Sequence, residues 1–98
     1  MAADIRDVDP GELRLPHSRS SGADPYKLQT QIAKHGTSTA GMPPVWVYEG
    51  SDGVLEIVDG VTRATRIAKL LPGTKIKAEV IGKSTKAKAQ NPRVGDRL

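Results

Sequence analysis

Residues 54–71 (VLEIVDGVTRATRIAKLL) read as a strand that passes directly into a helix, and this succession constrains the fold more than any other stretch of the chain. The run VLEIV is rich in β-branched residues, which favours a strand. Asp59 and Gly60 interrupt it, and from Val61 to Leu71 the apolar residues recur at helical spacing. A Pro-Gly pair then ends the helix. The domain must therefore combine strands with helices, and Asp59 to Arg63 lie at the junction.

This junction has the properties of an anion-binding site. The first N–H groups of a helix lack intrahelical partners, and the helix dipole is positive there. Gly60 allows a ligand to approach the backbone closely, and Arg63 adds a planar guanidinium in the first turn. We expect Gly60, Val61, Thr62 and Arg63 to bind a phosphate. The alternative is structural: Asp59 caps the helix, and Arg63 is solvated or pairs with a nearby carboxylate.

The six residues DGVTRA, 59–64, resemble the Asp-Gly-His-x-Arg element of the ParB/sulfiredoxin-like superfamily. The order of elements over residues 5–82 agrees with this resemblance: a helix ending in Gly, a Pro-Pro-x-x-Val strand, a second strand, the junction, a helix and a closing strand. Members of that superfamily include DNA-partitioning proteins that bind CTP, a free-serine kinase, sulfiredoxin and nuclease-type domains, some of them toxin tips of large secreted proteins. The resemblance implies that the Gly-x-x-Arg turn binds a nucleotide phosphate or holds the reactive residue.

The motif matches some members better than others. Gly60 and Arg63 match the shared element, and the kinase-like and nuclease-type versions also share Asp59, Thr62 and Ala64. Val61 replaces the motif His, which argues against a mechanism that needs that imidazole. The chain has no Cys, which excludes sulfiredoxin activity.

We expect a small α+β domain in which a mixed, twisted sheet carries two main helices, residues 24–35 and 61–71. Asp24 and Pro25 are typical of a helix start, and Gly36 of a helix end. Strands are expected within residues 4–15 and at 45–48, 54–58 and 75–81, with a hairpin turn at 49–53. In the second of these strands, Val45 and Val47 share one face.

Trp46 and Tyr48 share the opposite face of that strand. Trp46 could stack a nucleic-acid base. A lone strand Trp more often covers a helix or the open face of a sheet, and we favour that interpretation.

The net charge of +4 comes entirely from the C-terminal segment. Residues 1–82 contain ten Lys or Arg and ten Asp or Glu, whereas residues 83–98 contain five against one. We therefore divide the chain into a ParB-like domain, 1–82, and a basic, flexible tail, 83–98, in which Lys83, Lys86 and Lys88 are candidate nucleic-acid contacts. The alternative is a solvated terminus without a binding role. With two His residues, no Cys and no ligand spacing, no dedicated metal site is expected.

Catalysis on a phosphate needs a base and charge neutralisation, often with a metal. Asp59 has the best location for the base, and Arg63 for the cation. Glu12, Glu56 and His17 are further base candidates, and kinase-like relatives draw an acidic residue from the region of Glu12.

Two further arginines are candidate ligands. The polar loop 16–22 (PHSRSSG) contains Arg19 beside His17, and relatives place an Arg-containing segment here, so both residues are candidate phosphate ligands. Arg66 lies one helical turn after Arg63 and is either a nucleic-acid contact or a surface residue.

The function that the resemblance implies is a DNA nuclease, carried as the toxin tip of a bacterial secreted effector with an immunity protein as partner. The alternatives are a nucleotide-binding phosphotransfer domain that uses ATP or CTP with Mg²⁺, and a non-catalytic DNA-binding module. No apolar run has the length of a membrane span and no signal peptide is visible, so we expect no membrane partner. The location is then cytoplasmic, or inside a target cell after delivery.

Overall fold

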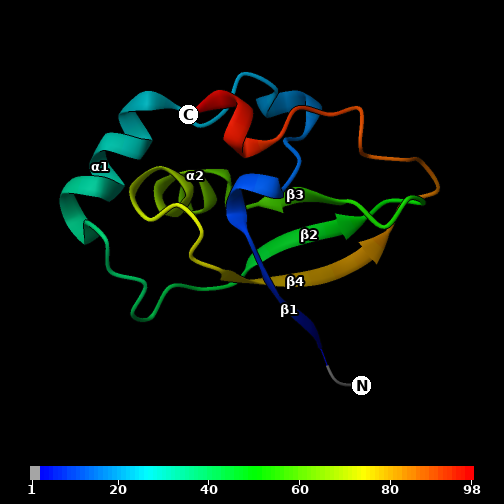
Figure 1. Cartoon of the computed structure of the whole chain (residues 1–98), viewed down its shortest axis with the longest axis horizontal. Coiled ribbons are helices and arrows are strands. Elements are labelled where there is room, and N and C mark those ends of the chain that lie inside the picture. The colour runs from blue at the N-terminus through cyan, green and yellow to red at the C-terminus, as the bar shows by residue number, and fades with distance from the viewer. Residues whose placement is uncertain (1–2) are drawn as a thin grey trace.

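The computed structural model describes residues 3–98, and its frame is a four-stranded mixed sheet in the order β1-β4-β2-β3. The strands are β1 (Asp4–Val8), β2 (Val45–Glu49), β3 (Leu55–Asp59) and β4 (Ile76–Lys83). β1 runs antiparallel to β4 and β3 antiparallel to β2, whereas β2 and β4 are parallel. Helices α1 (Pro25–His35) and α2 (Val61–Leu70) lie on one side of this sheet (Figure 1). The predicted α+β domain with a mixed sheet and two helices is confirmed.

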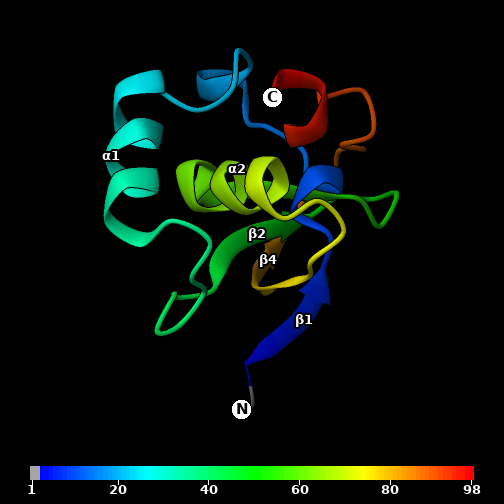
Figure 2. The same ribbon diagram turned by 60° about the vertical axis from the view of Figure 1, so that its left-hand side comes forward.

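The core lies between α2 and one face of the sheet. Val45 and Val47 of β2 are fully buried, while Trp46 and Tyr48 on the opposite face are exposed, so the predicted alternation is confirmed. No helix covers that second face in either view, and Figure 2 shows α1 packed beside α2 instead. The buried apolar residues are Leu13, Leu15, Val45, Val47, Ile57, Ala64, Ile67, Ala68, Ile76, Ala78 and Val94.

α2 is buried on more than its apolar stripe, because five successive residues, 64–68, are buried. Two of them are polar and find partners in the backbone. Thr65 Oγ1 donates to Val61 O over 2.7 Å. Arg66 Nη1 donates to the carbonyls of Gly36 and Ser38, over 2.7 and 2.9 Å, and so holds the connector after α1 against α2.

α1 begins and ends where the sequence predicts. Asp24 is the N-cap, and its Oδ1 accepts hydrogen bonds from the N–H groups of Tyr26 and Lys27. Gly36 follows the helix with a φ of 55°, in the left-handed region that glycine tolerates. α1 contains no fully buried residue, so it is the outer helix of the layer.

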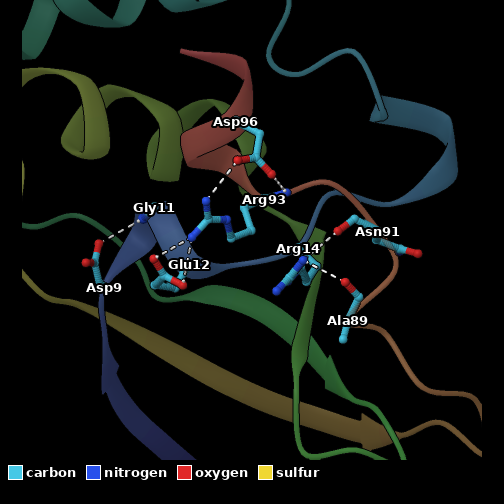
Figure 3. Close-up of polar contacts among 8 residues, drawn as sticks. All are labelled: Asp9, Gly11, Glu12, Arg14, Ala89, Asn91, Arg93 and Asp96. Atoms are coloured by element: carbon cyan, nitrogen blue, oxygen red, sulfur yellow. Dashed lines mark hydrogen bonds and ion pairs between the residues drawn. The ribbon is translucent and has the colours of Figure 1, made fainter.

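The C-terminal segment packs on the domain, and the predicted boundary near Gly82 is wrong in this respect. Val94 is 1 % exposed, and its N–H donates to Leu13 O over 2.9 Å. Asn91 is also buried, with its amide donating to Glu56 Oε2 over 2.6 Å. Arg14 Nη1 donates to the carbonyls of Ala89 and Asn91, both over 2.8 Å (Figure 3).

Short 3₁₀ turns complete this region. η1 (Pro10–Glu12) and η3 (Val94–Arg97) lie side by side against α2, although about eighty residues separate them (Figure 1). We call residues 84–98 the C-terminal strap. It lies against the core because Val94 is buried where η3 contacts α2 and η1.

Candidate functional site

A pocket of about 250 Å³ lies at the N-terminus of α2. Three parts of the chain form it: the end of β3 with the first turn of α2, the loop around η2 (His17–Arg19), and the start of α1. The lining residues are Pro16, Ser18, Arg19, Ala23, Asp24, Lys27, Gln31, Val58, Asp59, Gly60, Val61, Thr62 and Arg63. The junction that the sequence singles out is thus one wall of a concave site.

Gly60 is required at this position for two reasons. Its φ is 108°, which residues with a side chain rarely adopt. A Cβ placed on it would also lie 2.7 Å from Val45 Cγ1 and 2.8 Å from Arg63 Nη2. The guanidinium of Arg63 therefore folds back over the α-carbon of Gly60, so these two residues of the turn are in direct contact.

The first turn of α2 has no side-chain cap, because its N-cap residue is Gly60. This differs from α1, where the Asp24 carboxylate accepts from two N–H groups. The N–H groups at the start of α2 are consequently available to an acceptor in the pocket, at the positive end of the helix dipole. Asp59 does not act as the cap that the structural alternative assigned to it.

Arg63 is held by the protein and still borders the pocket. Its Nη2 donates to Pro44 O over 3.2 Å and lies 3.6 Å from Asp59 Oδ2. Its buried Nε has no partner among residues 3–98. The ion pair with Asp59 is weak, because that carboxylate is 64 % exposed and solvent screens it. Arg63 therefore pairs within the protein through Nη2, while most of its guanidinium N–H groups have no partner among residues 3–98.

Two more cations line the same pocket. Arg19 reaches it from η2, as predicted, and Lys27 from α1. The pocket also contains two carboxylates, Asp24 and Asp59, and Asp24 is already engaged as the α1 cap. Sequence analysis missed Lys27 as a site residue, since its place on the outer side of α1 gives no signal without knowing how α1 docks on α2.

The structure does not bring His17 or Glu12 into the pocket. His17 lies in η2, exposed, and is not among the lining residues. Glu12 lies in η1, where its carboxylate pairs with Arg93 Nη1 at 3.2 Å (Figure 3). Its predicted catalytic role beside Asp59 is not supported, because Glu12 is an ion-pair partner of the C-terminal strap.

The predicted nucleic-acid contacts also differ from the structure. Arg66 is 2 % exposed and bonds to backbone carbonyls, so it is a structural residue and not a surface contact. Lys88 is half-buried, with its Nζ 3.4 Å from Glu56 Oε1. Lys83 and Lys86 are exposed, and Lys83 Nζ lies 3.9 Å from a Glu49 carboxylate oxygen.

Within residues 3–98, no group of three or more His, Asp or Glu side chains is placed to hold a metal ion. The helices of this part of the chain are all too short or too polar to cross a bilayer. The sequence matches no protein-family model, and a search of curated proteins found no match either.

Proposed function

We propose that this chain binds a phosphodiester group of DNA in the pocket at the N-terminus of α2 and hydrolyses it, as a ParB-like nuclease domain. The observation that carries the proposal is the coincidence, in one pocket, of an uncapped helix N-terminus with three cationic side chains, Arg19, Lys27 and Arg63. A phosphate carries negative charge and several acceptor oxygens, and this combination supplies both donors and positive charge.

The roles of the individual groups follow from their positions. The first-turn N–H groups of α2 donate to two phosphate oxygens, and the Arg63 guanidinium neutralises the charge that develops on them. Asp59 is the general base, because its exposed carboxylate lines the pocket where a water molecule has access. Mg²⁺ is commonly held by one or two carboxylates together with substrate phosphate oxygens, so Asp59 is also the residue that would hold this ion with the substrate.

The proposal is tested by incubating the protein with supercoiled plasmid DNA and Mg²⁺, and separately with ATP or CTP and Mg²⁺. Nicking of the plasmid, lost in Arg63→Ala and Asp59→Asn, is the expected result. Turnover of a free nucleotide without nicking would assign the site to phosphotransfer instead. A matched control is Lys69→Ala, which removes an exposed positive charge from the last turn of the same helix.

Phosphate binding itself is measured by thermal shift with inorganic phosphate or pyrophosphate. Arg63→Ala removes a charge-assisted contact worth about 1.5–3 kcal/mol, which corresponds to roughly tenfold to hundredfold in affinity. Arg63→Lys restores only part of this affinity, since an ammonium lacks the planar fork. Equal ligand-induced shifts in wild type and Arg63→Ala would end the assignment of the phosphate site.

A further inference from the structure

One wall of the phosphate pocket, residues 16–23, lies outside both α-helices and the sheet, and we call it the pocket loop. It contributes Pro16, Ser18, Arg19 and Ala23 to the lining. Its 3₁₀ turn, η2, has no buried residue and no side-chain cap. The other two walls belong to α1 and to the junction of β3 with α2, so regular backbone hydrogen bonds fix them. The place of Arg19 in the pocket therefore depends on what holds the pocket loop.

Arg19 decides the balance of charge in the pocket. The lining contains three cations, Arg19, Lys27 and Arg63, and two carboxylates, Asp24 and Asp59. With Arg19 in place the cations outnumber the carboxylates by one, and without it the two signs balance. Because opposite charges in one small site offset each other, the net attraction of these side chains for a phosphate depends on Arg19.

Arg19 has no side-chain bond that would keep it at the pocket. It donates no side-chain hydrogen bond and forms no ion pair within residues 3–98, and it is exposed. Its backbone N–H donates to Pro16 O over 2.9 Å, and its carbonyl accepts from the N–H of Gly22 over 2.8 Å. Both partners belong to the pocket loop. The guanidinium is therefore placed by the backbone of the loop, and the loop needs a support elsewhere.

Arg97 supplies that support. Its Nε donates to Ser20 O over 3.0 Å, and in the part of the chain that the structure describes no other hydrogen bond joins the pocket loop to residues outside it. Its stem also packs on Gly22, where a Cβ would lie 3.0 Å from Arg97 Cβ. Gly22 is buried and has a φ of 100°, so the loop turns directly against Arg97. One side chain thus gives both a hydrogen bond and a packing contact to the segment that carries Arg19.

The turn that carries Arg97, η3, is itself anchored in the core. Val94 at its start is buried. Arg93, the residue before the turn, donates to Glu12 Oε1 over 3.2 Å and to Asp96 Oδ1 over 3.0 Å (Figure 3). Figure 1 shows this turn beside the chain that leads into α1. The core therefore fixes η3, and η3 fixes the pocket loop through Arg97.

We propose that Arg97 is a positioning residue of the phosphate pocket: through Ser20 and Gly22 it holds the pocket loop so that Arg19 contacts the bound phosphate. This inference rests on the proposed function, because it concerns the same pocket. It gives the C-terminal strap a role there, although the strap does not line the pocket. Loss of the Arg97 contact lets Arg19 leave and removes the excess of positive charge, while Arg63 and the start of α2 stay in place.

A matched pair of substitutions at Arg97 tests the role of its Nε–H group. Arg97→Gln and Arg97→Met remove the same charge and keep a stem that packs on Gly22, but only Gln has a nitrogen donor at the position of Nε. The affinity of the full chain for pyrophosphate is measured by isothermal titration calorimetry. Arg97→Gln should stay within about twofold of wild type, whereas Arg97→Met should bind about threefold to tenfold more weakly, which is the effect of one hydrogen bond.

A double-mutant cycle establishes whether Arg97 acts through Arg19. Arg19→Ala alone should weaken pyrophosphate binding about tenfold, because a charge-assisted contact is lost. In the Arg19→Ala background, Arg97→Met should weaken binding by less than about twofold, because the loop no longer has a cation to place. The charge control is Lys69→Ala, which removes an exposed cation from the last turn of α2 and should bind as wild type does.

A merely structural role for Arg97 predicts a different pattern. Arg97→Met would then melt at a lower temperature than wild type without ligand, and the folded protein would keep its pyrophosphate affinity. Circular dichroism gives the Tm of each variant. Because Arg97 is exposed, we expect every substitution at this position to stay within a few degrees of wild type.

Two results would overturn the inference. The first is equal pyrophosphate affinity in Arg97→Gln and Arg97→Met, and the second is an effect of Arg97→Met that persists in full when Arg19 is absent. If either occurs while binding still depends on Arg63, the phosphate site stands and only the positioning role of Arg97 is rejected. Pyrophosphate binding that does not depend on Arg63 would reject the phosphate site itself, and the positioning role with it.

Discussion

The packing of the C-terminal strap makes Val94→Ala the most informative test of the fold. Val94 is 1 % exposed and lies in η3 against η1 and α2, so its two γ-methyl groups are lost from a closed core. Transfer of these groups contributes about 0.8 kcal/mol each, and the cavity that remains adds to this, giving a total of about 2–3 kcal/mol. For a domain of this size, that corresponds to a fall in Tm of roughly 10–20 °C.

The assay is thermal unfolding followed by circular dichroism at neutral pH. Leu98→Ala is a matched control, because Leu98 is a larger apolar residue four positions further on and is 56 % exposed. We expect its Tm to stay within about 2 °C of wild type. A second variant, Asn91→Ala, removes the amide that donates to Glu56 Oε2 and should also lower the Tm, since it leaves a buried carboxylate with fewer partners.

The reasoning would be refuted if Val94→Ala and Leu98→Ala melted together at the wild-type temperature. The same conclusion would follow from a chain truncated after Lys83 that unfolds with wild-type Tm and cooperativity. Either result would mean that residues 84–98 form a tail independent of the core, as the charge distribution alone suggested.

The remaining predictions concern the junction, the buried arginine and the response to acid. Gly60→Ala should lower the Tm and abolish phosphate binding, because its Cβ would collide with Val45 and with the Arg63 guanidinium; an unchanged Tm would contradict this. Arg66→Ala should lower the free energy of unfolding, measured by chemical denaturation, by on the order of 3 kcal/mol, since the carbonyls of Gly36 and Ser38 lose their donor. A variant that loses nucleic-acid binding with no loss of stability would instead make Arg66 a nucleic-acid contact. Burial raises the pKa of Asp52, but backbone N–H donors from residues 89, 88 and 54 outweigh this, so its pKa lies below the ordinary value of 3.8. As the pH falls, Asp52 of the unfolded chain takes up its proton before Asp52 of the folded chain, so the stability that the ionised carboxylate contributes is present above about pH 4 and is lost as the pH falls through the lower folded pKa. Asp52→Asn should therefore show a smaller drop in Tm between pH 7 and pH 3 than wild type. An identical drop would contradict a stabilising role for the ionised Asp52.

Local features of the sequence determined the elements and one wall of the site. Asp24 and Gly36 mark the two ends of α1, through hydrogen bonds and backbone preferences that involve only neighbouring residues. The alternation of Val45 and Trp46 placed one residue in the core and the other on the open face. The sequence likewise predicted the helix start with free N–H groups, from a strand followed by Gly60 and by Arg63 in the first turn. The residues that decide this feature lie within a few positions of one another.

Only the tertiary structure decided which distant residues meet. Arg66 follows Arg63 by one turn, and its burial depends on the connector that closes over it from α1. Lys27 lines the pocket because α1 docks beside the start of α2. Glu12 lies outside the pocket, where its carboxylate pairs with Arg93. Propensity, capping and periodicity act over a few residues, whereas these contacts join residues that lie 28 to 81 positions apart in the sequence. Their outcome depends on how the whole chain fills its core, and a single apolar residue in a basic stretch gives no periodic signal of that.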